Sequence, residues 1–347
     1  MNRRSVSDRA HSLALLKRLV TLPLLSVSLS ASPGTVGESP ATTSLTSNAA
    51  SAIRTASIQR TGAVVRVRGT DARGEVYGTG FAVDPSGTIC TVTDLVRGTS
   101  SIVIVKDGKE YPCDILALDE GSGAAFLQTT GEMRRSGEQF LPPRATPEPP
   151  PFSPVLAIGY SGEEKPVVSL GMITGTKSHE GDCYFRVPQH LAKIPLAEGE
   201  AGAPVSDLDG HLIGMLISGN TQNGDCRILP VGAIEKLHTD LLRFGQLNPG
   251  WVGAVVEEAA VPEGNSSTRI ASVEPGSPAE VAGLRAGDMI LTLGNRRITQ
   301  PDKLLEASFY LTAGEIIPMT LWRGGKIKHV QIQCIHPPES KPHPTNP

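Results

Sequence analysis

The chain has 347 residues, of which 39% are hydrophobic and 19% charged, so it can bury the cores of two or three domains and is not disordered overall. Its net charge of −3 argues against a general nucleic-acid-binding protein, which needs a basic surface. Gly (37) and Pro (28) together exceed average usage, which indicates many turns between short strands rather than a helical bundle. The five cysteines are scattered and form no zinc or iron–sulfur motif, so we predict no metal and no cofactor.

The N-terminus, residues 1–31, has the composition of a secretory signal. Basic residues such as Arg3 and Lys17 precede an apolar run over 19–29, which is short for a bilayer span, and small residues follow it. We expect either a cleaved signal peptide or an uncleaved anchor, so the protein is exported and contacts a membrane only if this segment is retained. Residues 32–55 are rich in Ser, Thr and Ala and predict a flexible linker.

Short strands are expected at roughly ten-residue intervals through the next two stretches of chain, with turns between them. The first series comprises Val64–Val67, Val76–Val83, Thr88–Val92, Ile102–Val105, Asp114–Leu118 and Ala124–Gln128. After a connection over 131–153, the second comprises Val155–Gly159, Val167–Thr174, Tyr184–Val187, Leu212–Ser218 and Arg227–Val231. Apolar residues at helical spacing then predict one amphipathic helix over 232–246.

A third unit over 250–335 mixes strands with a helix. The expected strands are Arg269–Val273, Met289–Leu293, Pro318–Trp322 and His329–Gln333, and the expected helix is Asp302–Leu311. Residues 336–347 contain five prolines and are interpreted as a Pro-rich tail.

Two segments resemble known families. Residues 276–291, Gly-Ser-Pro-Ala-Glu-Val-Ala-Gly-Leu-Arg-Ala-Gly-Asp-Met-Ile-Leu, resemble the signature of the PDZ domains attached to HtrA-type proteases. Residues 78–91, Gly-Thr-Gly-Phe-Ala-Val-Asp-Pro-Ser-Gly-Thr-Ile-Cys-Thr, resemble the opening of the trypsin-like domain of the same family. Weaker matches follow in the family's order over 106–112, 155–159 and 209–215.

This resemblance implies a mostly β chain. A trypsin-like double six-stranded β-barrel would occupy 56–246, and one small α+β PDZ domain would occupy 250–335. It also implies a catalytic Ser, His and Asp, whose positions can be matched one by one.

All three members of the triad are replaced. The family's His, Asp and Ser positions are matched here by Asp94, Gly123 and Ala201. A serine protease needs a nucleophile, a base within hydrogen-bonding reach of it, and a carboxylate that orients the base. Because Ala201 has no hydroxyl, no acyl-enzyme can form there, and we interpret the chain as a pseudoprotease.

The loop that carried the nucleophile is a remnant. Gly199 and Gly202 match the family's glycines, whereas Glu200 replaces a neutral Asn, and a negative charge there would repel a developing oxyanion. The alternative is an active serine endopeptidase of envelope protein quality control with a non-standard site. Such a site would use a histidine of the second barrel as its base. The candidates are His179, His190 and His211, and none of them matches the position of the family's catalytic His.

The PDZ resemblance implies a peptide-binding site. PDZ domains add an extended peptide to a sheet edge and capture its terminal carboxylate with backbone amides. The residues that resemble the carboxylate-binding loop are Trp251, Val252, Gly253 and Ala254, and a strand over about 254–257 would pair with the peptide. The helix residues expected on the opposite wall are Leu304, Leu305 and Ser308, with burial in the core as the alternative for the apolar ones.

The cysteines leave two interpretations open. Cys90 with Cys113, and Cys183 with Cys226, are either disulfides or buried free thiols.

The leading hypothesis is therefore an exported HtrA-like pseudoprotease of the periplasm or cell envelope. It would bind peptides or unfolded proteins, mainly by their C-termini, as an adaptor, a chaperone-like holder or a regulator of active HtrA relatives. The resemblance also implies a homo-oligomer, a trimer. A passive scaffold that binds no peptide is the third hypothesis.

Overall fold

The computed structural model describes residues 60–72, 74–130, 139–162, 165–177, 187–260 and 266–338. The expected signal segment, the linker and most of the strand expected at Tyr184–Val187 lie outside these residues. Within the described ranges, no helix is long and apolar enough to cross a membrane.

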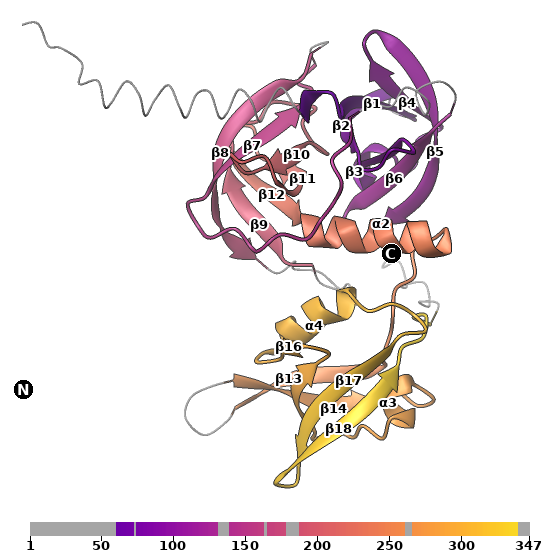
Figure 1. Cartoon of the computed structure of the whole chain (residues 1–347), viewed down its shortest axis with the longest axis vertical. Coiled ribbons are helices and arrows are strands. Elements are labelled where there is room, and N and C mark those ends of the chain that lie inside the picture. The colour runs from indigo at the N-terminus through magenta and orange to yellow at the C-terminus, as the bar shows by residue number, and fades with distance from the viewer. Residues whose placement is uncertain are drawn as a thin grey trace, which may run out of the picture. The chain divides into compact units, whose positions relative to one another are not determined.

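Twelve strands of the described chain close into two six-stranded barrels (Figure 1). The first has the spatial order β1-β2-β3-β6-β5-β4, with β1 (Val64–Asp71), β2 (Gly74–Ala82), β3 (Thr88–Val92), β4 (Ser101–Lys106), β5 (Lys109–Asp119) and β6 (Ala124–Thr129). The second has the order β10-β11-β12-β9-β8-β7, with β7 (Pro154–Gly159), β8 (Val167–Lys177), β9 (Gln189–Lys193), β10 (Pro204–Ser206), β11 (Leu212–Gly219) and β12 (Asp225–Pro230). The predicted double barrel is confirmed.

Two strands of the second barrel carry too weak a pattern to be predicted. β9 contains Gln189 and His190, polar residues that are nevertheless buried. β10 has only three residues, Pro204–Ser206, yet it closes the barrel between β7 and β11. Both are strands in part because strands distant in sequence pair with them: β12 with β9, and β7 with β10.

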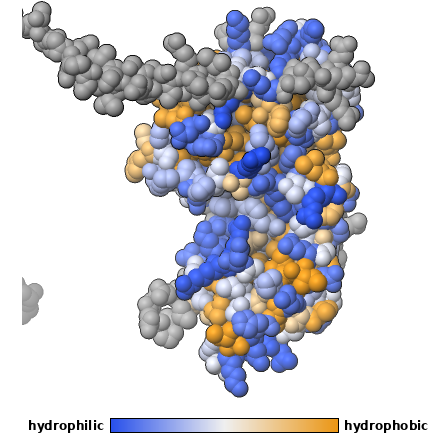
Figure 2. Space-filling view, viewed as in Figure 1, coloured by the Kyte–Doolittle hydropathy of each residue, from blue (hydrophilic) through white to orange (hydrophobic). Residues whose placement is uncertain are grey.

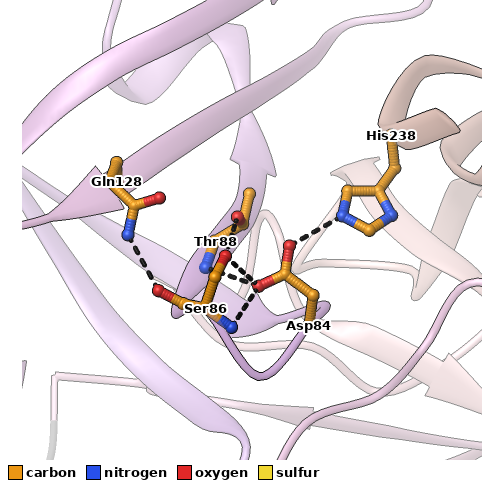
Figure 3. A network of polar contacts seen from close by, with 5 residues as sticks. All are labelled: Asp84, Ser86, Thr88, Gln128 and His238. Carbon is orange, nitrogen blue, oxygen red and sulfur yellow. Dashed lines mark hydrogen bonds and ion pairs between the residues drawn. The ribbon is translucent and has the colours of Figure 1, made fainter. Parts of the chain in front are cut away.

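Helix α2 (Val231–Phe244) follows the second barrel and is held against the first (Figure 3). His238 Nε2 lies 2.8 Å from Oδ2 of Asp84, in the turn between β2 and β3, and its ring stacks on Phe126. Asp84 Oδ1 also accepts hydrogen bonds from Ser86 and from the Thr88 N–H. Burial opposes ionisation of Asp84, but these hydrogen bonds outweigh it and hold its pKa well below the usual range.

A separate mixed domain follows. Its sheet has the order β13-β14-β15-β17-β18, with β16 paired to β15. The strands are β13 (Ala254–Ala260), β14 (Ser266–Val273), β15 (Met289–Leu293), β16 (Arg296–Arg297), β17 (Ile316–Arg323) and β18 (Lys326–Gln333), and the helices are α3 (Pro278–Val281) and α4 (Pro301–Phe309). Its buried core is distinct from that of the barrels. On the face shown in Figure 2, hydrophobic residues lie in separate patches among hydrophilic ones.

The described cysteines are free thiols. Cys90 is fully buried, and Cys113 is partly accessible with a pKa that burial raises to about 12. Of the two interpretations, the disulfide between Cys90 and Cys113 is therefore wrong. Cys226 is also free, and Cys183 lies outside the described residues.

Candidate functional site

The first candidate site is the place where the segments of Asp94, Gly123 and Ala201 meet. Hydrogen bonds, mostly between backbone groups, hold these segments together. The Thr93 N–H, next to Asp94, donates to the carbonyl of Gly123 over 2.9 Å. The Thr79 N–H donates to the carbonyl of Ala201 over 2.8 Å, and the Thr79 carbonyl accepts from the Thr91 hydroxyl over 2.7 Å. Three segments far apart in sequence thus meet beside β2 and β3, as a triad would require.

Asp94 faces solvent. It lies in the single 3₁₀ turn Thr93–Leu95 (η1), and its side chain is 83% exposed. Its carboxylate is 3.7 Å from Nη2 of Arg97, an exposed pair that contributes little energy. Among the described residues, no hydrogen bond or ion pair joins this carboxylate to the segments of Gly123 or Ala201.

Gly123 is an unfavourable position for a triad carboxylate. Its φ is +80°, a conformation that L side chains rarely adopt, and a Cβ there would lie 3.3 Å from Cγ2 of Ile217. Ile217 packs against the core, so an apolar methyl group occupies the space beside this position. Sequence reasoning did not single out Ile217, because only the fold places it next to Gly123.

The loop that holds Ala201 is sterically fixed. Gly199 and Gly202 have φ values of +94° and +88°. A Cβ at Gly202 would lie 1.9 Å from the Thr79 carbonyl oxygen, a distance that no real atom pair tolerates. The Gly199 carbonyl in turn accepts from the Thr79 hydroxyl over 2.9 Å. The backbone is therefore held closely although the residue at its centre is an inert methyl group.

Glu200 points into the protein. It is 2% exposed, and its Oε2 accepts a 3.3 Å hydrogen bond from the Ala197 N–H. Its side chain packs on Gly159, where a Cβ would lie 3.0 Å from Glu200 Cγ. Burial raises the pKa of this carboxyl, and the Ala197 hydrogen bond only partly opposes the shift. Burial thus favours the uncharged acid over the charge expected beside the oxyanion hole.

The second candidate site is the loop before β13. The Trp251 N–H donates to the Ile335 carbonyl, so Trp251 is tied to the end of the domain. The carbonyls of Val252 and Gly253 accept from Ala279 and Glu274, each over 2.9 Å.

The amides of this loop remain available. The N–H groups of Val252 and Gly253 have no acceptor among the described residues. Gly253 adopts φ +81°, and such consecutive backbone amides form a concave anion site. The loop can therefore hold a carboxylate.

The predicted wall residues on α4 differ in burial. Leu304 is 7% exposed and belongs to the core of the domain, as the alternative interpretation had it. Leu305 and Ser308 are half-buried, and the Ser308 hydroxyl donates to the Leu304 carbonyl of its own helix over 2.8 Å. Of the three residues, Leu305 and Ser308 are therefore more accessible to a ligand than Leu304.

In the described part of the chain, one group has metal-ligand geometry: Asp207, Asp209 and His211, in the turn between β10 and β11. Asp207 already accepts from the His211 N–H over 2.7 Å and lies 3.0 Å from His211 Nδ1. The guanidinium of Arg60 lies beside Gly210, and its positive charge disfavours a cation. These contacts are those of a tight hairpin, and we assign no metal here.

Comparison with known protein families finds a match for each of the two domains. Residues 78–215 match the trypsin-like peptidase domain, and residues 269–323 match the PDZ domain. The chain is 24% identical over 279 residues to a probable periplasmic serine endoprotease, DegP-like, from Rhizobium meliloti (strain 1021), covering 75% of this chain and 53% of that protein. It therefore spans about half the length of this curated relative.

Solved structures agree on the fold. The HtrA-type protease AlgW with decapeptide superposes with a TM-score of 0.65 at 18% identity, covering 82% of this chain and 99% of that one. The serine endoprotease from Yersinia pestis gives a TM-score of 0.60 at 21% identity, covering 82% and 97%. The chain thus has the fold of an HtrA-type protease, a trypsin-like domain followed by a PDZ domain.

Proposed function

We propose that this chain is an exported, non-catalytic HtrA-like protein that binds peptides or unfolded protein segments through its PDZ domain. It acts as an adaptor, a chaperone-like holder or a regulatory partner in the periplasm or cell envelope. The proposal keeps the domain bounds expected from the sequence, 56–246 and 250–335. The compartment is supported by the names of the relatives, which are periplasmic proteins.

The observation that carries the non-catalytic part is the nucleophile loop itself. Its backbone is fixed by contacts to Thr79, so the position of Ala201 is well defined, and the residue there has no reactive atom. In one measured protease triad, losing the Ser or the His alone costs about six orders of magnitude in turnover. Here the exposed Asp94 and the space filled by Ile217 remove the other two roles as well.

The binding part is supported by the loop before β13. The free amides of Val252 and Gly253 suit a carboxylate, and β13 lies at the edge of its sheet with β14 as its only partner among the described strands. Backbone addition at such an edge needs no catalytic side chain. The structure of AlgW was solved with a decapeptide, which shows a peptide complex for that protein.

A cleavage assay tests the non-catalytic part. Residues 32–347 are incubated with a fluorescently labelled unfolded protein, and we expect no cleavage and no labelling by a serine-directed fluorophosphonate. A restored variant carries Asp94→His, Gly123→Asp, Ala201→Ser and Ile217→Ser, the last change clearing the space beside Gly123. Its matched control keeps Ala201. Cleavage by wild type that survives repurification would make the chain an active endopeptidase.

A peptide screen tests the binding part. The full chain is offered a library of fluorescein-labelled decapeptides with free C-termini, and the best binders are remade as C-terminal amides. We expect binding that is lost on amidation and on Gly253→Ala. Binding of no peptide, or equal binding of acid and amide, would favour the passive scaffold.

A further inference from the structure

We propose that Glu258 makes the PDZ domain selective for ligands that carry a Lys or Arg about five residues before a free C-terminus. The inference rests on the proposed peptide binding and goes beyond it by naming the ligand's charge pattern. Three observations support it: how β13 pairs with β14, which face of the sheet α4 covers, and which of the acidic residues near the sheet edge already have cationic partners.

The direction of a bound peptide follows from the loop. The free amides of Val252 and Gly253 precede the first residue of β13, so a carboxylate held there lies at the N-terminal end of that strand. A peptide added to the free edge of β13 must then run antiparallel to it, with its upstream residues passing Ala254 first and Ala260 last.

Strand alternation places Glu258 on the face that α4 covers. Val256 is paired with Ile270, which is fully buried in the core together with Leu304 of α4. Glu258, two residues further along β13, is paired with Thr268, which is also fully buried. Side chains two residues apart share a face of a strand, so Glu258 stands on the α4 side of the sheet, at its edge.

The neighbouring acid lies on the opposite face and is already paired. Glu257 Oε1 accepts hydrogen bonds from Arg269 Nε and Nη2, at 2.9 and 2.6 Å. Glu258 is exposed and has no cationic partner among the described residues. The one basic residue of α4, Lys303, is bonded to Glu306 at 2.8 Å. Glu258 is therefore a free negative charge beside the path of the peptide.

The spacing fixes the position of the complementary charge. Glu258 is five residues beyond Gly253, about 17 Å along a strand at roughly 3.3 Å per residue. An antiparallel peptide whose carboxylate lies at Gly253 thus brings about its fifth residue from the end beside Glu258. Opposite charges on neighbouring strands attract and like charges repel, so this residue should be basic and not acidic.

The experiment uses the full chain and the best binder from the C-terminal screen. That peptide is remade with Lys or Glu at the fourth, fifth or sixth residue from its C-terminus, each as free acid and as amide. Fluorescence anisotropy measures Kd at 50 mM and 1 M NaCl. At the best of the three positions, we expect the Lys peptide to bind about five-fold more tightly than the Glu peptide. This ratio should fall toward one at 1 M NaCl.

Two variants isolate the residue. Glu258→Lys should invert the preference, so that the Glu peptide binds more tightly. Glu257→Gln breaks the ion pair with Arg269 on the opposite face and should leave the preference unchanged. Equal binding of Lys and Glu peptides, or an equal effect of both variants, would overturn the inference while leaving peptide binding intact. If no free-acid peptide binds at all, the proposed function fails first.

Discussion

The cleft around Ala201 and the edge of the PDZ sheet differ in the kind of chemical group that each offers. In the cleft, the backbone around Gly199 and Gly202 is held by Thr79, but the side chains that would react are absent. At the PDZ edge, the groups proposed to bind are the backbone amides of Val252 and Gly253, which belong to the main chain and not to side chains. Under the proposed function, catalysis would depend on side chains that the cleft lacks, whereas peptide binding would depend mainly on backbone groups that the fold itself positions.

The largest expected effect tests how strictly the cleft backbone is fixed. Gly202→Ala would put a Cβ 1.9 Å from the Thr79 carbonyl oxygen at φ +88°, and we expect a loss of about 4 kcal/mol or of folding altogether. Gly245→Ala is the matched control, because φ is +71° there but nothing lies within 4 Å, so about 1 kcal/mol is expected. Urea denaturation measures both. Equal losses would mean that the cleft loop is not constrained.

The corresponding substitution in the PDZ loop should weaken peptide binding and destabilise the PDZ domain, with little effect on the barrels. In Gly253→Ala, the Cβ would meet that of Ser277 at 2.3 Å, at φ +81°. Ser277 caps α3 by accepting from the Glu280 N–H, so this domain should lose about 3 kcal/mol and peptide affinity at least ten-fold. Hydrogen exchange resolved by peptide should locate the loosening in 250–335. Loosening spread equally over the barrels would contradict this expectation.

Asp84→Asn tests how much the contact between helix α2 and the first barrel contributes to stability. It weakens the buried contact to His238, and we expect about 2 kcal/mol less stability at pH 7. The pKa of Asp84 is lowered in the fold, so its contribution is present above the unfolded value of about 3.9 and is lost as pH falls below it.

The difference in unfolding free energy between wild type and Asp84→Asn should therefore shrink as the pH falls below about 4. Chemical denaturation at several pH values measures it, with the neighbouring exposed Ser86→Ala as a milder control. A difference that does not shrink as the pH falls below about 4 would show that these contacts do not favour the ionised form of Asp84.

The smallest expected effect is that of Glu200→Gln, which should stabilise the protein where the preceding substitutions destabilise it. Its pKa is raised by burial, so the folded state favours the protonated form, and its contribution to stability is lost as pH rises through the folded pKa. Glu200→Gln should therefore gain about 1 kcal/mol at pH 8 relative to wild type and little at pH 4. Thermal unfolding across this range measures the gain. A constant difference would mean that Glu200 does not change ionisation on folding.

Much of the architecture follows from the sequence. Turn residues between short apolar runs predict the barrel strands, and β3 was placed at its observed bounds, Thr88–Val92. The segment over 276–291 predicts the turn and short helix of a PDZ domain, which the structure contains as α3. The absence of a nucleophile at Ala201 is a matter of residue identity, and no fold can supply the missing hydroxyl.

Only the tertiary structure decided the rest, because the deciding contacts join residues distant in sequence. β9 pairs with β12 and β10 pairs with β7, both distant in sequence, and Asp84 meets His238 across 154 positions. The burial of Glu200, the methyl group of Ile217 beside Gly123, and the place of Glu258 on the α4 face each depend on packing. The sequence determines which chemical groups are available. The fold decides which of them meet, because burial and hydrogen bonding depend on contacts between distant segments that form only when the two barrels close and the PDZ sheet assembles.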